Sequence, residues 1–138
     1  MADKKRVLIL CTGNSARSQM GEGLLRHDAG GCFTVESAGT RPSIVRPEAI
    51  AVMKEVGIDI TSQRSKHVDE FAGQDFDHVL TVCDNAKESC PVFFSKATRL
   101  HHSFNDPAAI DGAEERRLSE FRRVRDELRL YLKSFAKT

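Results

Sequence analysis

The chain of 138 residues contains no tryptophan, one tyrosine and only four cysteines. Four cysteines are too few for the disulfide framework of a secreted scaffold. They are Cys11, Cys32, Cys83 and Cys90, and no two of them have the spacing of a structural zinc site. We therefore expect no metal. In a reducing compartment, such thiols serve as inert core residues or as redox catalysts.

Long apolar runs are also missing, and no stretch approaches the roughly 20 residues of a membrane span. Residues 1–6 are charged, but the apolar run behind them, Val7 to Leu10, is too short for the core of a signal peptide. The net charge of +1 argues against a broad surface for nucleic acid or lipid. We expect a cytoplasmic monomer that binds neither, folded as one domain over residues 1–138.

Apolar strand-like runs alternate with helical patterns along the chain. This alternation predicts an α/β fold, a four-stranded parallel sheet flanked by helices on both faces. Ligands of such sheets bind at the carboxyl ends of the strands. The predicted strands are 6–10, 33–37, 78–82 and 98–101, and the predicted helices are 17–29, 47–56 and a long C-terminal segment, with a short helical turn at 69–71.

The C-terminal segment has the clearest helical pattern. Apolar residues recur every three or four positions and form one stripe: Leu118, Phe121, Val124, Leu128, Leu132 and Phe135. Five arginines could indicate nucleic-acid binding, but glutamates and aspartates are interleaved with them. We therefore interpret the arginines, which are Arg116, Arg117, Arg122, Arg123 and Arg125, as part of a solvated helix face.

The first predicted strand runs directly into a cysteine and a polar stretch, residues 11–18, which we call the anion loop. A loop that opens a helix presents N–H groups to an anion, and the same dipoles favour a thiolate over a thiol. Arg17 adds a charged fork that fits a tetrahedral oxyanion. Cys11 is therefore predicted to be a nucleophile, with the oxyanion held by Thr12, Gly13, Asn14, Ser15, Ala16, Arg17 and Ser18.

Three further candidates follow later strands. Asp106, which precedes Pro107, could be a general acid that protonates a departing oxygen, or an ordinary turn residue. Cys83 follows the third strand, and Cys90 lies seven residues on. On a regular helix these two thiols would be about 10 Å apart along the axis, so they can form a disulfide only if the polar segment between them rearranges. They are resolving thiols or incidental ones.

Together these residues resemble the thioredoxin-coupled arsenate reductases, which share the fold of the low-molecular-weight protein tyrosine phosphatases. The resemblance covers essentially the whole chain. The stretches that carry it are Cys-Thr-Gly-Asn-Ser-x-Arg-Ser-Gln-Met at 11–20, Glu-Ser-Ala-Gly-Thr at 36–40, the Cys83/Cys90 pair, Asp-Pro-Ala at 106–108 and Phe-Arg-Arg-Val-Arg-Asp-Glu at 121–127.

The resemblance implies a relay of three cysteines in arsenic detoxification. Cys11 would attack arsenate while Asp106 protonates the leaving hydroxide. Cys83 would then attack Cys11 and release arsenite, and Cys90 would attack Cys83. The final disulfide would be reduced by thioredoxin, with no other cofactor.

One position departs from part of the family. Some members bind potassium through residues that match Asn14, Glu22 and Ser37 together with an acidic group at position 66. This chain has Lys66 there. Its ammonium would take the place of the cation, so we expect activity to be independent of potassium.

Two alternatives use the same anion loop. A phosphotyrosine phosphatase would need Cys11, Arg17 and Asp106, but the phosphatases typically carry tyrosines after the Asp-Pro pair, where this chain has alanine. A phosphatase would also leave Cys83 and Cys90 without a role. The second alternative is a binding or redox-sensing module whose thiols oxidise without turnover.

Overall fold

The computed structural model describes residues 4–83 and 96–137. A four-stranded parallel sheet organises them, in the order β2-β1-β3-β4. The strands are β1 (Lys5–Cys11), β2 (Phe33–Gly39), β3 (His78–Thr81) and β4 (Thr98–His101). The chain therefore begins at the centre of the sheet, which places the end of β1 in the middle of the carboxyl edge.

The central strand β1 is covered on both faces. Val7 to Leu10 are fully buried, as an uninterrupted apolar run predicts for a strand inside an α/β sheet. Ile9 points toward helix α1, where it packs against Gly21. Arg6 lies on the opposite face, and its guanidinium stacks 4.3 Å from the ring centre of Phe76.

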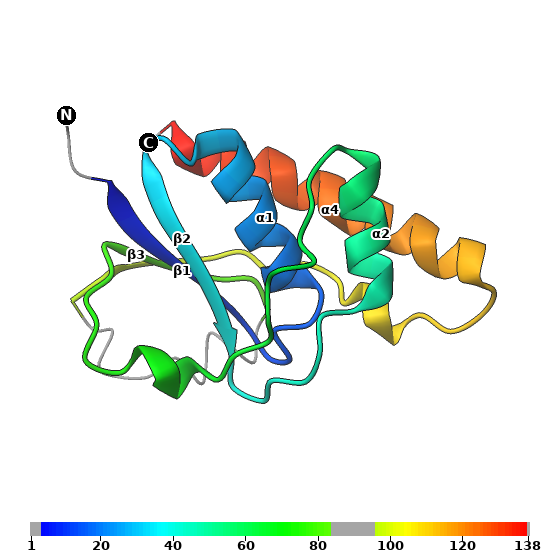
Figure 1. Ribbon diagram of the computed structural model, residues 1–138, viewed down its shortest axis with the longest axis horizontal. Coiled ribbons are helices and arrows are strands. Elements are labelled where there is room, and N and C mark those ends of the chain that lie inside the picture. Colours follow the sequence, from blue (N-terminus) through cyan, green and yellow to red (C-terminus); the bar gives the residue numbers. More distant parts are fainter. Residues whose placement is uncertain (1–3, 84–95, 138) are drawn as a thin grey trace.

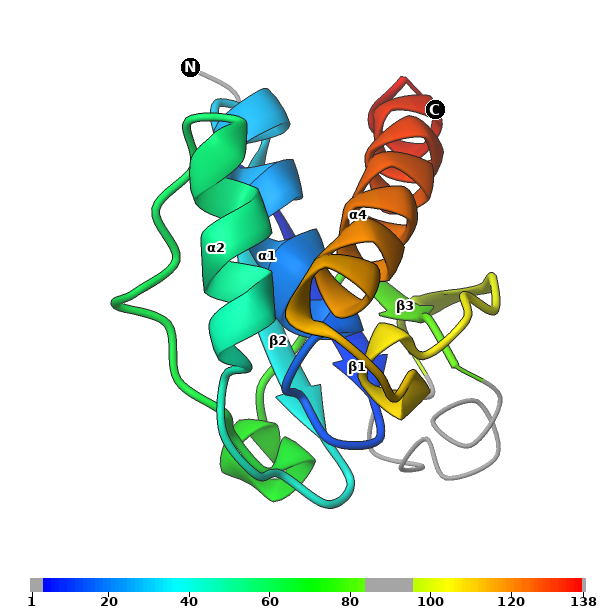
Figure 2. The same cartoon turned by 90° about the vertical axis from the view of Figure 1, so that its right-hand side faces the viewer.

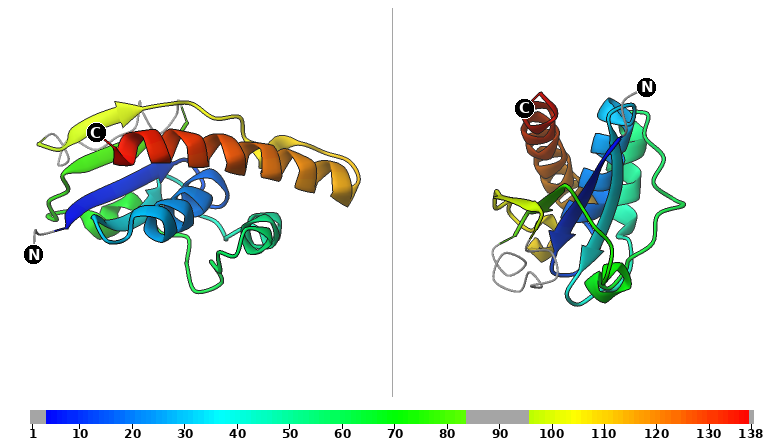
Figure 3. Two further views of the ribbon diagram at one scale, coloured as in Figure 1. Left: turned by 90° about the horizontal axis from the view of Figure 1, so that it is seen from above. Right: turned by 90° about the vertical axis from the view of Figure 1, so that its left-hand side faces the viewer.

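The three α-helices lie together on one face of the sheet, as Figures 1 and 2 show. They are α1 (Arg17–Ala29), α2 (Pro47–Glu55) and α4 (Glu114–Ala136). Figure 3 shows the chain between the 3-10 turn η1 (Val68–Phe71) and β3 crossing the other face. A second 3-10 turn, η3 (Pro107–Ala109), precedes α4.

The predicted α/β class and the four-stranded parallel sheet are confirmed, and α1 has the predicted bounds. The strand β2 is longer than predicted and continues to Gly39, where the sheet extends to a bridge with His67. In the described residues, the cover of the second face comes from the segment that contains η1 rather than from an α-helix.

The apolar stripe of α4 is buried as predicted, with Leu118 half-buried at its start. Arg125 is an exception to the predicted solvated face of arginines. Its side chain is buried and donates to the carbonyl oxygen of Val52 at 2.8 Å and to Glu55 at 3.0 Å. Arg125 therefore joins α4 to the end of α2.

Within the described residues, no helix has the length and apolar character needed to cross a membrane.

Candidate active site

The anion loop lies at the carboxyl end of β1, where Cys11 is the last residue of the strand. Asn14 has a φ of 46°, so the loop turns through the left-handed region that asparagine tolerates. The helix α1 starts at Arg17, and its N-cap is Ala16, whose side chain has no oxygen to accept from the first N–H groups. The start of α1 therefore leaves N–H groups available to an anion.

The sulfur of Cys11 is buried among hydrogen-bond partners. Its Sγ lies 2.8 Å from the hydroxyl of Ser18 and accepts from the backbone N–H of Asn14 at 3.2 Å. The Asn14 side chain in turn donates to Ser18 at 2.7 Å and to Ser37 at 3.0 Å. These contacts hold the nucleophile within a polar cluster at the base of the loop.

The segment that follows β2 clamps the anion loop from outside. The N–H groups of Arg41, Ser43 and Arg46 donate to the carbonyl oxygens of Thr12, Gly13 and Ser15 respectively, at 2.8, 3.2 and 2.9 Å. These carbonyls point outward, which leaves the loop N–H groups on its inner side.

Gly39 is required where β2 approaches the loop, because a Cβ there would lie 2.5 Å from the Thr12 oxygen. The loop therefore packs directly against the backbone of β2, with no side chain between them.

Arg17 and Asp106 meet at this edge, as the sequence predicts. Arg17 donates to the backbone oxygen of Phe104 at 3.1 Å, and its Nη2 lies 3.9 Å from Asp106 Oδ2. The other oxygen of Asp106 accepts from Ala108 N–H and caps η3. Asp106 is thus a turn residue that also places a half-exposed carboxyl beside the arginine. The turn role is therefore observed, and the role of Asp106 as a general acid stays a prediction.

Cys83 also lies at the site. Its Sγ is 3.3 Å from the hydroxyl of Thr12, the residue after Cys11, and it is a buried, free thiol. Cys90 lies outside the described residues. Cys32 is exposed next to the first residue of β2, at the opposite edge of the sheet from Cys11.

Lys66 is buried below the anion loop. Its ammonium lies 3.7 Å from Glu22 and 4.0 Å from Glu36, and it donates to the carbonyl of Arg64 at 3.3 Å. Glu22 accepts a hydrogen bond from Ser37, which links it to the side chain of Asn14. The positive charge thus lies among the residues that the resemblance assigns to a potassium site.

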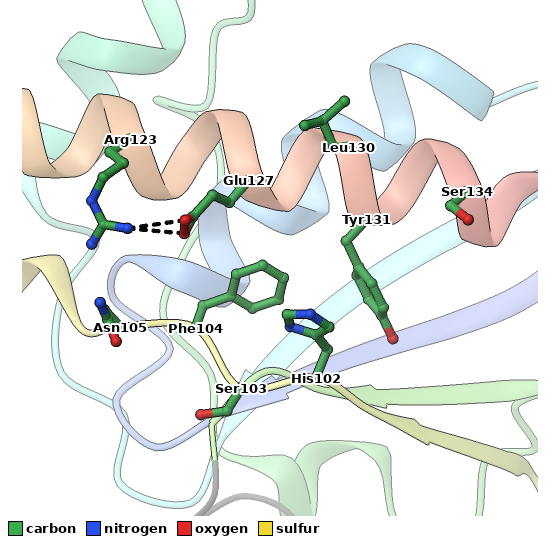
Figure 4. Close-up of a pocket in the computed structure, with 9 residues that line it drawn as sticks. All are labelled: His102, Ser103, Phe104, Asn105, Arg123, Glu127, Leu130, Tyr131 and Ser134. Atoms are coloured by element: carbon green, nitrogen blue, oxygen red, sulfur yellow. Dashed lines mark hydrogen bonds and ion pairs between the residues drawn. The ribbon is translucent and has the colours of Figure 1, made fainter.

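A groove of about 620 Å³ lies between the chain after β4 and helix α4 (Figure 4). The rings of His102, Phe104 and Tyr131 lie against one another in it. Phe104 links the groove to the site, because its carbonyl oxygen accepts from Arg17.

Among residues 4–83 and 96–137, no three His, Cys, Asp or Glu side chains form a metal-binding group.

Sequence reasoning did not find the amide side chains behind the loop. Gln19, which is fully buried, donates to Asn14 and to the carbonyl of Arg64. Gln63 donates to Gln19 in turn. Gln19 lies within the stretch 11–20 that carries the resemblance, but its position there does not indicate these contacts.

The fold and this loop place the chain in a known class. Residues 6–138 match the family of low molecular weight phosphotyrosine protein phosphatases, and the chain belongs to this family of enzymes. Within it, the chain is 44% identical over 136 residues to the arsenate reductase of Halalkalibacterium halodurans, covering 99% of this chain and 98% of that protein.

Solved structures show the same similarity. An arsenate reductase in its oxidized state superposes with a TM-score of 0.83 at 32% identity, covering 96% of this chain and 97% of the other. The low molecular weight protein tyrosine phosphatase from T. tengcongensis gives a TM-score of 0.81 at 26% identity, covering 97% and 99%.

Proposed function

We propose that this chain reduces arsenate to arsenite through a relay of Cys11, Cys83 and Cys90, with thioredoxin as the final reductant. The observation that carries the proposal is the position of Cys83, whose sulfur contacts the residue next to Cys11. Hydrolysis of a phosphate ester uses one cysteine nucleophile and has no role for a second thiol there. The similarity to arsenate reductases over nearly the whole chain supports the same chemistry.

The first step forms a bond between Cys11 and arsenic. The Cys11 thiolate attacks arsenate, which is held by the N–H groups of the anion loop and by the guanidinium of Arg17. One As–O bond breaks, and Asp106 donates the proton that lets hydroxide leave as water. Arsenic remains in the +5 state, so this step consumes no electrons.

The second step is the reduction. The Cys83 thiolate attacks the sulfur of Cys11 and an S–S bond forms. The S–As bond breaks, and its electron pair stays on arsenic, which leaves as arsenite in the +3 state. The two thiols have supplied the two electrons.

The third step returns Cys11 to its starting state. The Cys90 thiolate attacks Cys83, and Cys11 departs as a thiolate. The dithiol of thioredoxin then reduces the Cys83–Cys90 disulfide. Arsenate detoxification in the reducing cytoplasm is the cellular role that follows from this chemistry.

The test is an arsenate reduction assay with thioredoxin, thioredoxin reductase and NADPH. Wild type should turn over many times, whereas Cys83→Ser and Cys90→Ser should not, although Cys11 stays reactive toward alkylation. Cys32→Ser is the matched control, because Cys32 lies at the opposite edge of the sheet, and it should keep full turnover. Sustained turnover by Cys90→Ser would contradict the relay and indicate another thiol reductant.

A phosphatase is the second candidate, because phosphate and arsenate have the same tetrahedral geometry and the family match is to phosphatases. The relay predicts that hydrolysis of an aryl phosphate needs Cys11 and is unaffected by Cys83→Ser. Efficient hydrolysis without arsenate reduction in the wild type would favour the phosphatase.

A further inference from the structure

Behind the anion loop, hydrogen bonds run in one direction through the amide side chains of Asn14 and Gln19. Each amide is oriented by a group that can only donate or only accept. The backbone N–H of Lys66 donates to Asn14 Oδ1 at 2.8 Å. The backbone oxygen of Arg64 accepts from Gln19 Nε2 at 2.9 Å. Neither amide can rotate by half a turn without bringing two like groups together.

Gln63 fixes the outer end of this chain. Its Nε2 donates to the backbone oxygen of Gln19 at 3.0 Å and to Gln19 Oε1 at 2.8 Å. Its own oxygen faces Nη1 of Arg26 at 3.4 Å. Because a carbonyl only accepts and a guanidinium only donates, the orientation of Gln63 is set from both sides. Figure 1 shows the chain between α2 and η1, which carries Gln63, running past α1.

The orientation of the Asn14 amide affects the hydrogen bonds that Cys11 receives. Asn14 Nδ2 has two protons, and it donates to Ser18 and Ser37. Since the oxygen of Ser18 already accepts from Asn14, its own proton is free to point at the sulfur of Cys11, 2.8 Å away. The backbone N–H of Asn14 is a second donor to this sulfur. A thiolate at this position would thus have two donors, the Ser18 hydroxyl and the Asn14 N–H.

We propose that Gln63 is a positioning residue for Cys11. By holding Gln19, it adds to the backbone groups of Lys66 and Arg64 that orient the Asn14 amide, and so it helps to commit the hydroxyl of Ser18 to donate to the sulfur. The inference rests on the proposed role of Cys11 as the nucleophile. Its effect falls on the sulfur itself, so it can be measured without arsenate.

Two substitutions remove the donor of Gln63 in different ways. Gln63→Met keeps the length of the side chain and supplies no donor. Gln63→Glu keeps the shape but places a carboxylate against the two oxygens of Gln19. To donate to this carboxylate, Gln19 would have to rotate its amide. Its own oxygen would then lie against the carbonyl oxygens of Asn14 and Arg64, which would repel it. Gln63→Glu should therefore disturb this series of hydrogen bonds more than Gln63→Met does.

The measurement is the rate at which iodoacetamide alkylates Cys11 as a function of pH, followed by mass spectrometry of the peptide that contains it. We expect the midpoint of this profile to rise by about half a pH unit in Gln63→Met and about one unit in Gln63→Glu. At a pH below the midpoint, the rate then falls about threefold and tenfold. The other titratable and charged groups around the loop are the same residues in every variant; they are Arg17, Glu22, Arg26, Glu36, Lys66, Cys83 and Asp106.

Ser62→Glu is the matched control, because it adds the same charge on an exposed neighbour without entering the hydrogen bonds of Gln63. It should leave the midpoint of Cys11 alkylation unchanged. The proposal is overturned if the midpoint stays at the wild-type value in whichever of the two Gln63 variants folds. It is overturned as well if Ser62→Glu shifts the midpoint as far as Gln63→Glu does.

A wild type that fails to reduce arsenate while the predicted shifts are seen would refute the proposed function and leave the role of Gln63 intact. Normal arsenate reduction by the wild type together with an unchanged alkylation profile in the variants would support the proposed function and refute the role of Gln63. The two proposals therefore fail separately.

Discussion

Replacing Lys66 by methionine tests the idea that a fixed ammonium supports the anion loop. The side chains of Lys66 and Glu22 are 7% and 4% exposed, so the pair is nearly shielded from water. Methionine fills most of the volume of the lysine stem and removes the charge together with the hydrogen bond to the Arg64 carbonyl. The substitution leaves the Glu22 carboxylate below the loop without its buried partner.

The distance sets the scale of the effect. At 3.7 Å, two unit charges in an effective dielectric of 20 attract by about 4 to 5 kcal/mol. Removing one partner of a buried pair costs roughly 3–5 kcal/mol. Glu22 keeps two partners, Arg26 at 2.6 Å and the hydroxyl of Ser37. We therefore expect the lower end, a loss of about 3 kcal/mol in the free energy of unfolding.

Urea unfolding at neutral pH measures this loss. Arg64→Met is the matched control, because the ion pair between Arg64 and Glu70 lies on the surface and contributes little. An equal loss in the two variants, or a loss below about 1 kcal/mol in Lys66→Met, would refute the reasoning.

The rate of arsenate reduction by the wild type should be the same in potassium chloride and in sodium chloride at equal ionic strength. A marked, specific activation by potassium would contradict the role of Lys66.

Three further predictions concern pH and the backbone. The hydrogen bond from Arg129 lowers the pKa of Asp28 below its ordinary value of 3.8, so its stabilisation is present at neutral pH and is lost as the pH falls through the lowered value. Asp28→Asn should therefore destabilise the protein in urea at neutral pH, and this loss should shrink as the pH falls through the lowered pKa. Burial raises the pKa of Tyr131 above 10.0, so the folded protein should form tyrosinate at a higher pH than the unfolded protein. The ultraviolet absorbance reports this residue alone, because it is the only tyrosine and tryptophan is absent; equal midpoints in folded and unfolded protein would disprove the shift. Gly39→Ala would place a Cβ 2.5 Å from a carbonyl oxygen of the anion loop and should reduce arsenate turnover about a hundredfold, whereas Gly31→Ala, with open space around it, should not.

The sequence predicts elements well where the pattern is local. The helix α1 has the predicted bounds because Cys11 to Ala16 interrupt the apolar run and Gly30 follows its last turn. The stripe of α4 is buried because its spacing alone determines which face is apolar. The convergence of Cys11, Cys83 and Asp106 follows from a rule of parallel sheets, in which all strands end at the same edge.

Contacts made through the backbone could not be predicted in this way. The clamp on the anion loop depends on the N–H groups of Arg41, Ser43 and Arg46, and every residue except proline would supply the same donors. The contact between Gln19 and Gln63 joins positions 44 residues apart, and neither residue has a pattern of its own. Arg125 was misplaced because arginines and acidic residues are interleaved in this part of the sequence and predict a solvated face, whereas its partners, Val52 and Glu55, lie on another helix.

Alanine at the N-cap of α1 has a consequence for how binding and folding are related. A serine or aspartate there would stabilise the helix by about 1 kcal/mol, because its oxygen would accept from the free N–H groups. The same oxygen would occupy the place of an anion. With Ala16, no side chain caps the first turn of the helix, and an oxyanion bound there would supply the missing acceptor. At equal concentration, oxyanions should therefore raise the thermal unfolding midpoint in the order of their affinity, which makes melting temperature a measure of specificity that needs no turnover.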